Sequence, residues 1–511
     1  MPVVGRVVTR PLIYRLPPAY VAPLFAVATA VAFLIASPPV GDLFAAQARQ
    51  SAATHGVGLR YWFSWFGGTV PGHYSVLGPL LSRLADVRVL GAVATVLITP
   101  LCYRLVKGSR HPALATWLAA IGASLSLWSG RVPFAVGTVL MLVALLTVRG
   151  NRRYAAAAAG AATVLVSPVS GVFLILGIAG IYLHDPARRT TTVLTSAAAG
   201  VVLISVAAYF GMPGTEGFPL GEGLLTAATL AAMLLARPPA YLQTVLVISI
   251  LACPLLVLVP NGMGSNFERF SWLCLPVAVA ATARSKLPVL LLTTLFALSC
   301  TIGQTVKDLN VASKPISNTS YYASLIAELD RTSNLPNYRI EVIPDGTHVA
   351  AYALLNHAQL ARGYETQSDN TLNAVLSSPA LDATTYKRWL DDNAVGYVVI
   401  NETTLKTGPE DRLVRAGGLP YLTLAWSDPH WKLYRVADPN PIAAPPARVV
   451  DADQASLVIE TPHAATTGVR IRWSRFLHVA GPGAAQATLR SDGQGWTTLI
   501  THSPGRYVLT G

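Results

Sequence analysis

Charged residues are scarce in this chain of 511 residues: Asp, Glu, Lys and Arg make up 12%, whereas soluble domains carry roughly 25%. Because 52% of the residues are hydrophobic and the mean hydropathy is +0.47, a fully soluble protein is excluded. The distribution is uneven. Acidic residues are rare before residue 304 and return to ordinary levels after it. We therefore expect a membrane domain followed by a soluble region.

Cysteine is also sparse. The four cysteines lie in apolar runs and have neither disulfide-framework nor zinc-site spacing, so we interpret them as small core residues: Cys102, Cys253, Cys274 and Cys300. The net charge of +13 suggests nucleic acid at first sight. However, much of the excess Lys and Arg lies in short loops between apolar runs, where positive charge orients membrane helices. We therefore expect no nucleic-acid partner.

Long apolar runs are abundant. A membrane span needs about 20 apolar residues, and by this criterion the chain has about eleven candidates: 18–38, 87–106, 112–129, 132–148, 154–168, 169–184, 191–211, 222–236, 240–259, 269–284 and 287–304.

Every second loop between these runs is basic. The residues concerned are Arg6, Arg10 and Arg15, then Arg104, Lys107 and Arg110, then Arg149, Arg152 and Arg153, then Arg188 and Arg189, then Arg237, and finally Arg284 and Lys286. Basic loops are typical of the cytoplasmic side. The pattern predicts a multi-pass cell-membrane protein with a cytoplasmic N-terminus, and an odd number of spans places residues 305–511 outside.

The predicted soluble region divides in two. Residues 305–438 contain β-rich runs at 339–344, 395–402 and 431–437 with intervening helical patterns, which indicates a mixed α/β domain. A proline-rich linker at 437–447 leads to residues 439–511, where short strands separated by turn signals predict a small β-sandwich. The membrane domain is then 1–304.

Ionisable and aromatic residues gather where the predicted spans meet the outer face: Asp42, His73, Tyr74, Arg131, Glu216, Glu268 and Arg269. Polar groups at membrane depth are often functional. Each also has a plain interpretation: Asp42 as the N-cap of a following helix, Glu268 and Arg269 as an ion pair, Arg131 as a helix anchor, Glu216 as a solvated turn residue. His73 and Tyr74 would belong to one or two interfacial helices in the aromatic segment that begins at Tyr61.

In the soluble region, the stretch LARGYETQSDN at 360–370 is densely polar. We interpret Arg362, Glu365 and Asp369 as a structural network against the membrane domain, with an acceptor-binding surface as the alternative.

One arrangement of these features resembles the GT-C glycosyltransferases, which use sugars linked to a polyprenyl phosphate. The match rests on an acidic residue after the first span, interfacial helices, many spans and an extracytoplasmic C-terminal region. The stretches that carry it are GDLFAAQAR at 41–49, residues 68–81, GRVPFAVG at 130–137, SPVSGVF at 167–173 and GSNFERF at 264–270. The composition, LARGYETQSDN and YKRWLDDNAVGYVVI at 386–400 also resemble actinobacterial membrane proteins.

The resemblance implies that Asp42 is the catalytic base and that Arg269 and Arg131 stabilise the lipid phosphate. Glu268, His73, Tyr74 and Glu216 would bind substrate, and the acceptor would be an envelope glycan or lipid. Many family members carry paired acids that hold a divalent metal, whereas Asp42 is flanked by Gly41 and Leu43, so the sequence assigns no metal ligand and leaves a metal requirement open. The alternatives are a transporter or lipid flippase, and a non-catalytic envelope scaffold.

Overall fold

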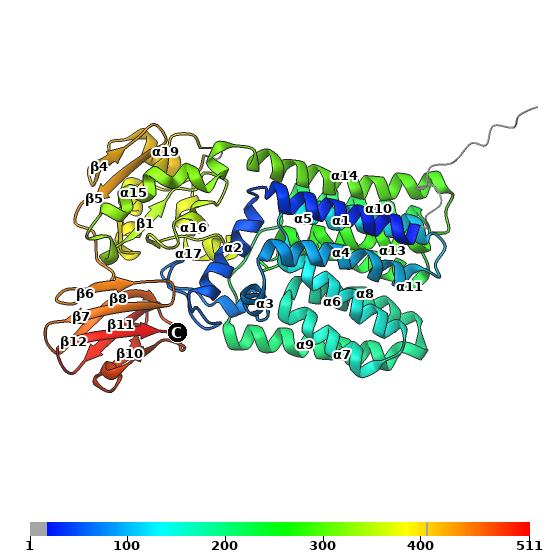
Figure 1. Cartoon of the computed structure of the whole chain (residues 1–511), viewed down its shortest axis with the longest axis horizontal. Helices are drawn as coiled ribbons and strands as arrows, with labels where there is room; N and C mark the ends of the chain where they lie inside the picture. The colour runs from blue at the N-terminus through cyan, green and yellow to red at the C-terminus, as the bar shows by residue number, and fades with distance from the viewer. Residues whose placement is uncertain (1–17, 405–406) are drawn as a thin grey trace, which may run out of the picture.

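The computed structural model describes residues 18–404 and 407–511. A bundle of roughly parallel helices occupies one end of the molecule, and two strand-containing parts occupy the other (Figure 1). The basic residues Arg6, Arg10 and Arg15, which contribute to the predicted orientation, lie outside the described residues.

Each of the predicted spans is helical in the bundle. The helices are α1 (Pro18–Ala36), α4 (Val87–Val106), α5 (Pro112–Trp128), α6 (Val132–Arg149), α7 (Arg153–Val166), α8 (Pro168–His184), α9 (Arg189–Phe210), α10 (Leu220–Leu235), α11 (Ala240–Leu258), α12 (Phe267–Arg269), α13 (Leu275–Thr282) and α14 (Leu287–Ala312).

Local signals explain where several of these helices begin. The Asp86 carboxylate caps α4 by accepting a hydrogen bond from the backbone nitrogen of Arg88. Ser167 caps α8 in the same way, and Pro168 then occupies the first helical position, where a missing N–H costs nothing. A π-helical segment, Phe270–Cys274, joins α12 to α13.

Among the residues that the structure describes, five helical segments are long and apolar enough to cross a membrane: 87–106, 132–149, 186–210, 240–258 and 287–312. A sixth is added if 21–36 and 41–54, bent by 71°, form one broken span. Four further apolar helices are shorter. The chain is therefore a membrane protein with several apolar helices, and the predicted number of about eleven spans stays a prediction.

The segment between α1 and α4 contains α2 (Gly41–Thr54) and α3 (Gly78–Leu84). The prediction of short helices here is thus partly right, but the prediction that the aromatic run from Tyr61 lies along the membrane interface is wrong. Tyr61, Trp62, Phe63 and Trp65 are at most 2% exposed. They pack into the hydrophobic cores of the two strand-containing parts, because buried aromatics provide large apolar contact areas.

The first strand-containing part has a five-stranded mixed sheet in the order β2-β1-β3-β5-β4. β1 is parallel to β2 and β3, whereas β5 is antiparallel to β3 and β4. The elements are α15 (Ala323–Arg331), β1 (Arg339–Val342), α16 (Ala350–Ala353), β2 (Gln359–Leu360), α17 (Thr366–Leu372), α18 (Ala383–Asp392), β3 (Val395–Asn401), α19 (Pro409–Ala416), β4 (Leu422–Ser427) and β5 (Trp431–Val436).

The C-terminal part has two antiparallel sheets, β10-β11-β8 and β6-β7-β12-β9, over a shared apolar core. Its strands are β6 (Arg448–Ala452), β7 (Ser456–Thr461), β8 (Ala465–Arg472), β9 (His478–Ala480), β10 (Ala487–Ser491), β11 (Trp496–Thr501) and β12 (Gly505–Thr510). The domain boundaries at 304 and 438 remain predictions; α14 itself continues to Ala312.

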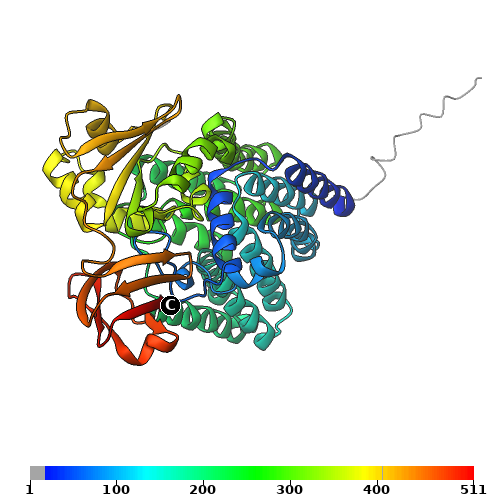
Figure 2. The same ribbon diagram turned by 60° about the vertical axis from the view of Figure 1, so that its left-hand side comes forward.

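Helix α2 lies at the junction between the bundle and the strand-containing parts (Figure 2). Its residues Phe44, Ala48 and Ala52 belong to the same hydrophobic core as strand residues Ile340 and Val399. The first turn of α2 is therefore held between the membrane domain and the α/β domain, and this junction contains the candidate site.

Candidate active site

A polar cavity of about 440 Å³ lies at this junction. Six of the seven residues singled out in the sequence line it: Asp42, Tyr74, Arg131, Glu216, Glu268 and Arg269. Further lining residues come from α14 (Lys307 and Asp308) and from the α/β domain (His348, Tyr364, Glu365 and Gln367). The cavity thus has one wall in the membrane domain and another in the soluble region.

The Asp42 carboxylate lies between two guanidinium groups. Its Oδ2 is 3.3 Å from a terminal nitrogen of Arg269 and 3.6 Å from Nε of Arg131. Its Oδ1 accepts a hydrogen bond of 2.6 Å from the hydroxyl of Tyr364. Two cations and a donor favour the ionised carboxylate, and the side chain keeps 34% of its surface exposed, so it remains reachable from the cavity.

The N-cap interpretation of Asp42 is wrong. Helix α2 begins at Gly41 with Val40 at its N-cap position, and the apolar side chain of Val40 makes no capping hydrogen bond. Asp42 therefore lies in the first turn, where a negative charge is favourable near the helix N-terminus, while its carboxylate bonds to residues from distant parts of the chain.

Arg131 enters the site because of Gly130. This glycine has φ +79°, and a Cβ atom there would lie 2.5 Å from the backbone nitrogen of Leu43. Only glycine lets the turn between α5 and α6 approach the start of α2 so closely. Arg131 also lies 3.8 Å from the Asp308 carboxylate, and its Nε has no hydrogen bond among the described residues.

Glu216 and Glu268, the two other acids predicted as site residues, differ in their contacts. Glu216 accepts hydrogen bonds from Ser265 (3.1 Å) and from Gln367 of the α/β domain (2.8 Å). Burial raises the pKa of Glu216, and the Ser265 hydroxyl and Arg269 only partly oppose this effect. Glu268 lines the cavity with its buried Oε1 unpartnered in the part of the chain that the structure describes, so it offers an unused acceptor.

His73 does not line the cavity but supports it. Its Nε2 lies 3.1 Å from Glu365 Oε2, and Arg49 of α2 forms an ion pair with the other oxygen of Glu365. The Arg49 guanidinium is also 3.7 Å from the centre of the Tyr74 ring, a cation–π contact. Burial raises the pKa of Glu365, but the charges of His73 and Arg49 outweigh it and hold that pKa below its ordinary value.

The polar stretch 360–370 divides between two roles. Arg362 donates to Asp369 (2.8 Å) and Glu410 (2.8 Å) and lies 3.6 Å from Glu341, which forms a buried network inside the α/β domain. Tyr364 and Glu365 lie between Arg362 and Asp369 in the sequence. Tyr364 contacts Asp42, and Glu365 contacts Arg49. The predicted network of Arg362, Glu365 and Asp369 against the membrane domain is therefore wrong for Arg362 and Asp369, which pair inside the α/β domain. Of the three, Glu365 makes the predicted kind of contact, through Arg49 of α2.

Sequence reasoning assigned no role to Tyr364 or Arg49, although both make direct contacts in the site. A usable signal was present for Tyr364: a single aromatic residue within the densely polar LARGYETQSDN. Arg49 had no such signal, because an arginine in the third turn of a short helix is ordinarily solvated. Only the docking of the α/β domain onto α2 buries it.

A metal requirement can be tested against the donor set. Among the described residues, no three His, Cys, Asp or Glu side chains gather closely enough to hold a metal ion. Around Asp42 the nearest charges are the guanidinium groups of Arg131 and Arg269, which repel a divalent cation. These residues do not fit a metal site, and we derive no step through one.

No protein-family model and no curated protein matches the chain. Among solved structures, it is similar to the mycobacterial arabinofuranosyltransferase AftD, with 17% identity, a TM-score of 0.45, and coverage of 92% of this chain and 42% of that one. A variant of AftD, in a second structure, gives 15% identity and a TM-score of 0.44, covering 83% of this chain and 42% of that one. The chain thus spans about two fifths of the length of the proteins it resembles.

Proposed function

We propose that this protein is a membrane glycosyltransferase that transfers a sugar from a polyprenyl-phosphate donor to an envelope glycan or lipid on the extracytoplasmic side. The observation that carries the proposal is the position of Asp42: a partly exposed carboxylate in a polar cavity, paired with two arginines at the end of an apolar helical bundle.

The proposed chemistry needs a base and a cation. As the acceptor hydroxyl attacks the anomeric carbon, its proton passes to the Asp42 carboxylate. The bond between that carbon and the phosphate oxygen breaks, and the electron pair leaves with the lipid phosphate. Arg269 and Arg131 neutralise the charge that develops on this leaving group. Both arginines already pair with Asp42, so donor phosphate would share or take over these contacts.

Two substrates of different polarity match the two parts of the molecule (Figure 1) that meet at this polar cavity. The apolar helices on the membrane side suit a polyprenyl chain, and the α/β domain supplies polar groups such as Gln367 and Glu365 that suit a sugar acceptor. The unpartnered Oε1 of Glu268 offers an acceptor for a sugar hydroxyl.

Charge placement disfavours the transporter alternative. Asp42, Arg131, Glu222 and Glu268 lie in or beside the first turns of their helices, all at the end of the bundle that faces the α/β domain. Transporters usually bind substrate near the bilayer midplane, whereas these polar groups gather at one end of the bundle, which favours an enzyme over a transporter.

The test is transfer by purified full-length protein from a panel of radiolabelled pentosyl and hexosyl polyprenyl phosphates to envelope acceptors. Asp42→Asn keeps the size of the side chain but removes the base, and we expect the rate to fall by about 100-fold or more. Asp86→Asn is the matched control, since Asp86 belongs to the same segment but caps α4 outside the cavity. Full activity of Asp42→Asn would refute the proposed role of this residue.

A further inference from the structure

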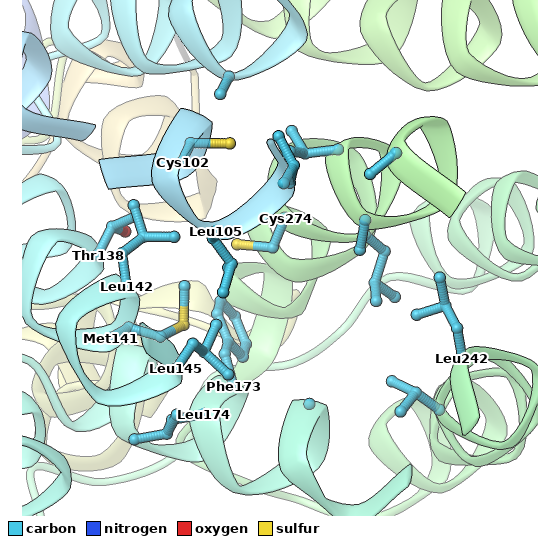
Figure 3. A pocket seen from close by; sticks show the side chains of 18 of the residues that line it. Cys102, Leu105, Thr138, Met141, Leu142, Leu145, Phe173, Leu174, Leu242 and Cys274 are labelled. Atoms are coloured by element: carbon cyan, nitrogen blue, oxygen red, sulfur yellow. The ribbon is translucent and has the colours of Figure 1, made fainter. Parts of the chain in front are cut away.

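A second cavity, of about 670 Å³, lies inside the helical bundle. Its walls come from α4, α5, α6, α8, α11 and α13, and most side chains that line it are apolar. In Figure 3, Met141 and Leu145 of α6 and Phe173 of α8 gather on one side of this space, with Leu242 of α11 on the other. Its volume falls within the range of about 300–1,000 Å³ that ligand sites occupy.

The cavity follows α6 along almost its whole length. Phe134 lines it near the start of the helix and Arg149 at the end. These residues are separated by about 22 Å at 1.5 Å per residue. Phe134 and Leu273 line both this cavity and the polar one. The space is therefore long and narrow, and it ends at the opposite face of the bundle from Asp42.

That far end is basic. Arg149, Arg188, His184 and Asp185 line it. Arg188 forms an ion pair with Asp185, but Arg149 donates only to the backbone carbonyls of Arg104 and Leu105. Within residues 18–404 and 407–511, no carboxylate pairs with Arg149. Its positive charge is therefore uncompensated where the cavity opens.

A hydroxyl group lies at the same end. Ser109, in the loop between α4 and α5, lines the cavity, and its buried Oγ has no hydrogen-bond partner among the described residues. A guanidinium group with an uncompensated charge and an unpartnered hydroxyl are the donors that a phosphate accepts from. An apolar channel that ends in such donors matches an amphiphile with an anionic head.

We propose that this cavity binds an anionic glycerophospholipid of the bilayer, with its phosphate at Arg149 and Ser109 and one hydrocarbon chain along α6. The site is separate from the proposed donor site. If the phosphate of the sugar donor lay at Arg131, it would be about 22 Å or more from Arg149. The donor phosphate therefore cannot neutralise Arg149, and a different anion would bind there. The inference does not depend on the proposed glycosyl transfer.

The first experiment measures lipid binding to the purified full-length protein in detergent by native mass spectrometry. Phosphatidylglycerol should bind more tightly than phosphatidylcholine of the same chain length. Arg149→Gln should weaken phosphatidylglycerol binding roughly fivefold, the effect of one basic residue near a lipid surface. Arg152→Gln, which changes an exposed arginine three residues away that does not line the cavity, should leave binding unchanged.

The second experiment fills the cavity with a bulky side chain. It tests the proposal independently of Arg149→Gln, and so remains informative if that variant does not fold. Gly177 lines the cavity, and a Cβ added to it meets no atom within 4 Å. Gly177→Phe should therefore abolish lipid binding without unfolding the protein. Gly303→Phe is the control, because Gly303 is an exposed helical glycine with the same open surroundings outside the cavity.

Three results would overturn the proposal: equal binding of phosphatidylglycerol and phosphatidylcholine, unchanged binding in Gly177→Phe, or displacement of the bound lipid by a polyprenyl phosphate at lower concentration than by phosphatidylglycerol. The last result would make the cavity a channel for the tail of an isoprenoid lipid.

Discussion

The hydroxyl of Tyr364 donates a 2.6 Å hydrogen bond to Oδ1 of Asp42 across 322 residues of sequence. One residue belongs to the first turn of α2 and the other to the loop between β2 and α17. Burial raises the pKa of Tyr364 well above its ordinary value, and the Asp42 charge raises it further. Tyr364 therefore stays protonated and acts as a fixed donor that orients the carboxylate.

Removing this hydroxyl should impair the proposed reaction without unfolding the protein. Tyr364→Phe keeps the ring but frees Oδ1 of Asp42, and we expect the transfer rate to fall roughly tenfold, the equivalent of one hydrogen bond to a charged group. The control is Tyr421→Phe, which deletes a hydroxyl that donates to Ala383 far from the cavity. Equal rates in the two variants would show that Tyr364 does not position the base.

Substitution of either arginine beside Asp42 should impair use of the sugar donor, whereas substitution of an arginine outside the cavity should not. Arg269→Gln and Arg131→Gln each remove a cation from the cavity, and we expect kcat/KM for the polyprenyl-phosphate sugar to fall by roughly 10- to 150-fold, the range for a charged hydrogen bond. The control is Arg88→Gln, since Arg88 pairs with Asp86 outside the cavity. Unchanged kinetics in both variants would contradict phosphate binding at this site.

Gly130 offers a test of the packing that brings Arg131 to Asp42. Gly130→Ala places a Cβ 2.5 Å from the backbone nitrogen of Leu43 at a φ of +79°. We expect a loss of about 2–4 kcal/mol of unfolding free energy, from left-handed strain and from displacement of α2. The measurement is thermal unfolding in detergent, together with the transfer rate.

Gly493→Ala is the control for Gly130→Ala, because Gly493 has nearly the same φ, +81°, but an added Cβ there meets no atom within 4 Å. It isolates the strain, which costs about 1–2 kcal/mol. If the two alanine variants lost the same stability, close contact between the α5–α6 turn and α2 would not matter.

The ion pairs of Glu365 predict how stability depends on pH. The pKa of Glu365 is held below its ordinary value of 4.5 by His73 and Arg49. Between this folded pKa and 4.5, the unfolded state binds a proton that the folded state does not. The stabilisation is therefore present above about pH 4.5 and is lost as the pH falls through the folded pKa.

Glu365→Gln should remove the Glu365 contribution to this pH dependence and, because Arg49 is left buried without its carboxylate, cost about 3–5 kcal/mol at neutral pH. Thermal unfolding between pH 3 and 6 measures both effects. Glu460→Gln is a suitable control, since Glu460 forms exposed ion pairs with Arg448 and Arg506 on the C-terminal sheets. A wild-type curve that was flat below pH 4.5 would contradict the assignment.

Local patterns predicted the helices of the bundle well. The run at 132–148 corresponds to α6 at Val132–Arg149, and the run at 240–259 to α11 at Ala240–Leu258. Each of these segments is apolar over its whole length, so hydrophobicity alone identifies it. The strands β1, β3 and β5 were also predicted, since β-branched residues and turn signals mark them locally.

The aromatic run at Tyr61–Phe66 was predicted wrongly for a physical reason. Exposed aromatics at a membrane interface and buried aromatics in a core have the same composition, and only the partner surface distinguishes them. Here the partner surfaces are β-strands more than 250 residues later: Trp62 and Trp65 belong to one core with Ile340, and Phe63 belongs to another with Leu457. No local pattern reports such contacts.

The amino-acid sequence by itself determined that this is a membrane protein with helices at these positions, and that polar residues stand at their ends. Hydrophobic runs, caps and turn residues act within a few residues of chain, so they can be read directly. Only the tertiary structure decided that Asp42, Arg131, Arg269 and Tyr364 share one cavity. Their proximity results from docking the α/β domain and the α5–α6 turn onto α2, and such long-range packing depends on shape complementarity between surfaces that are distant in sequence.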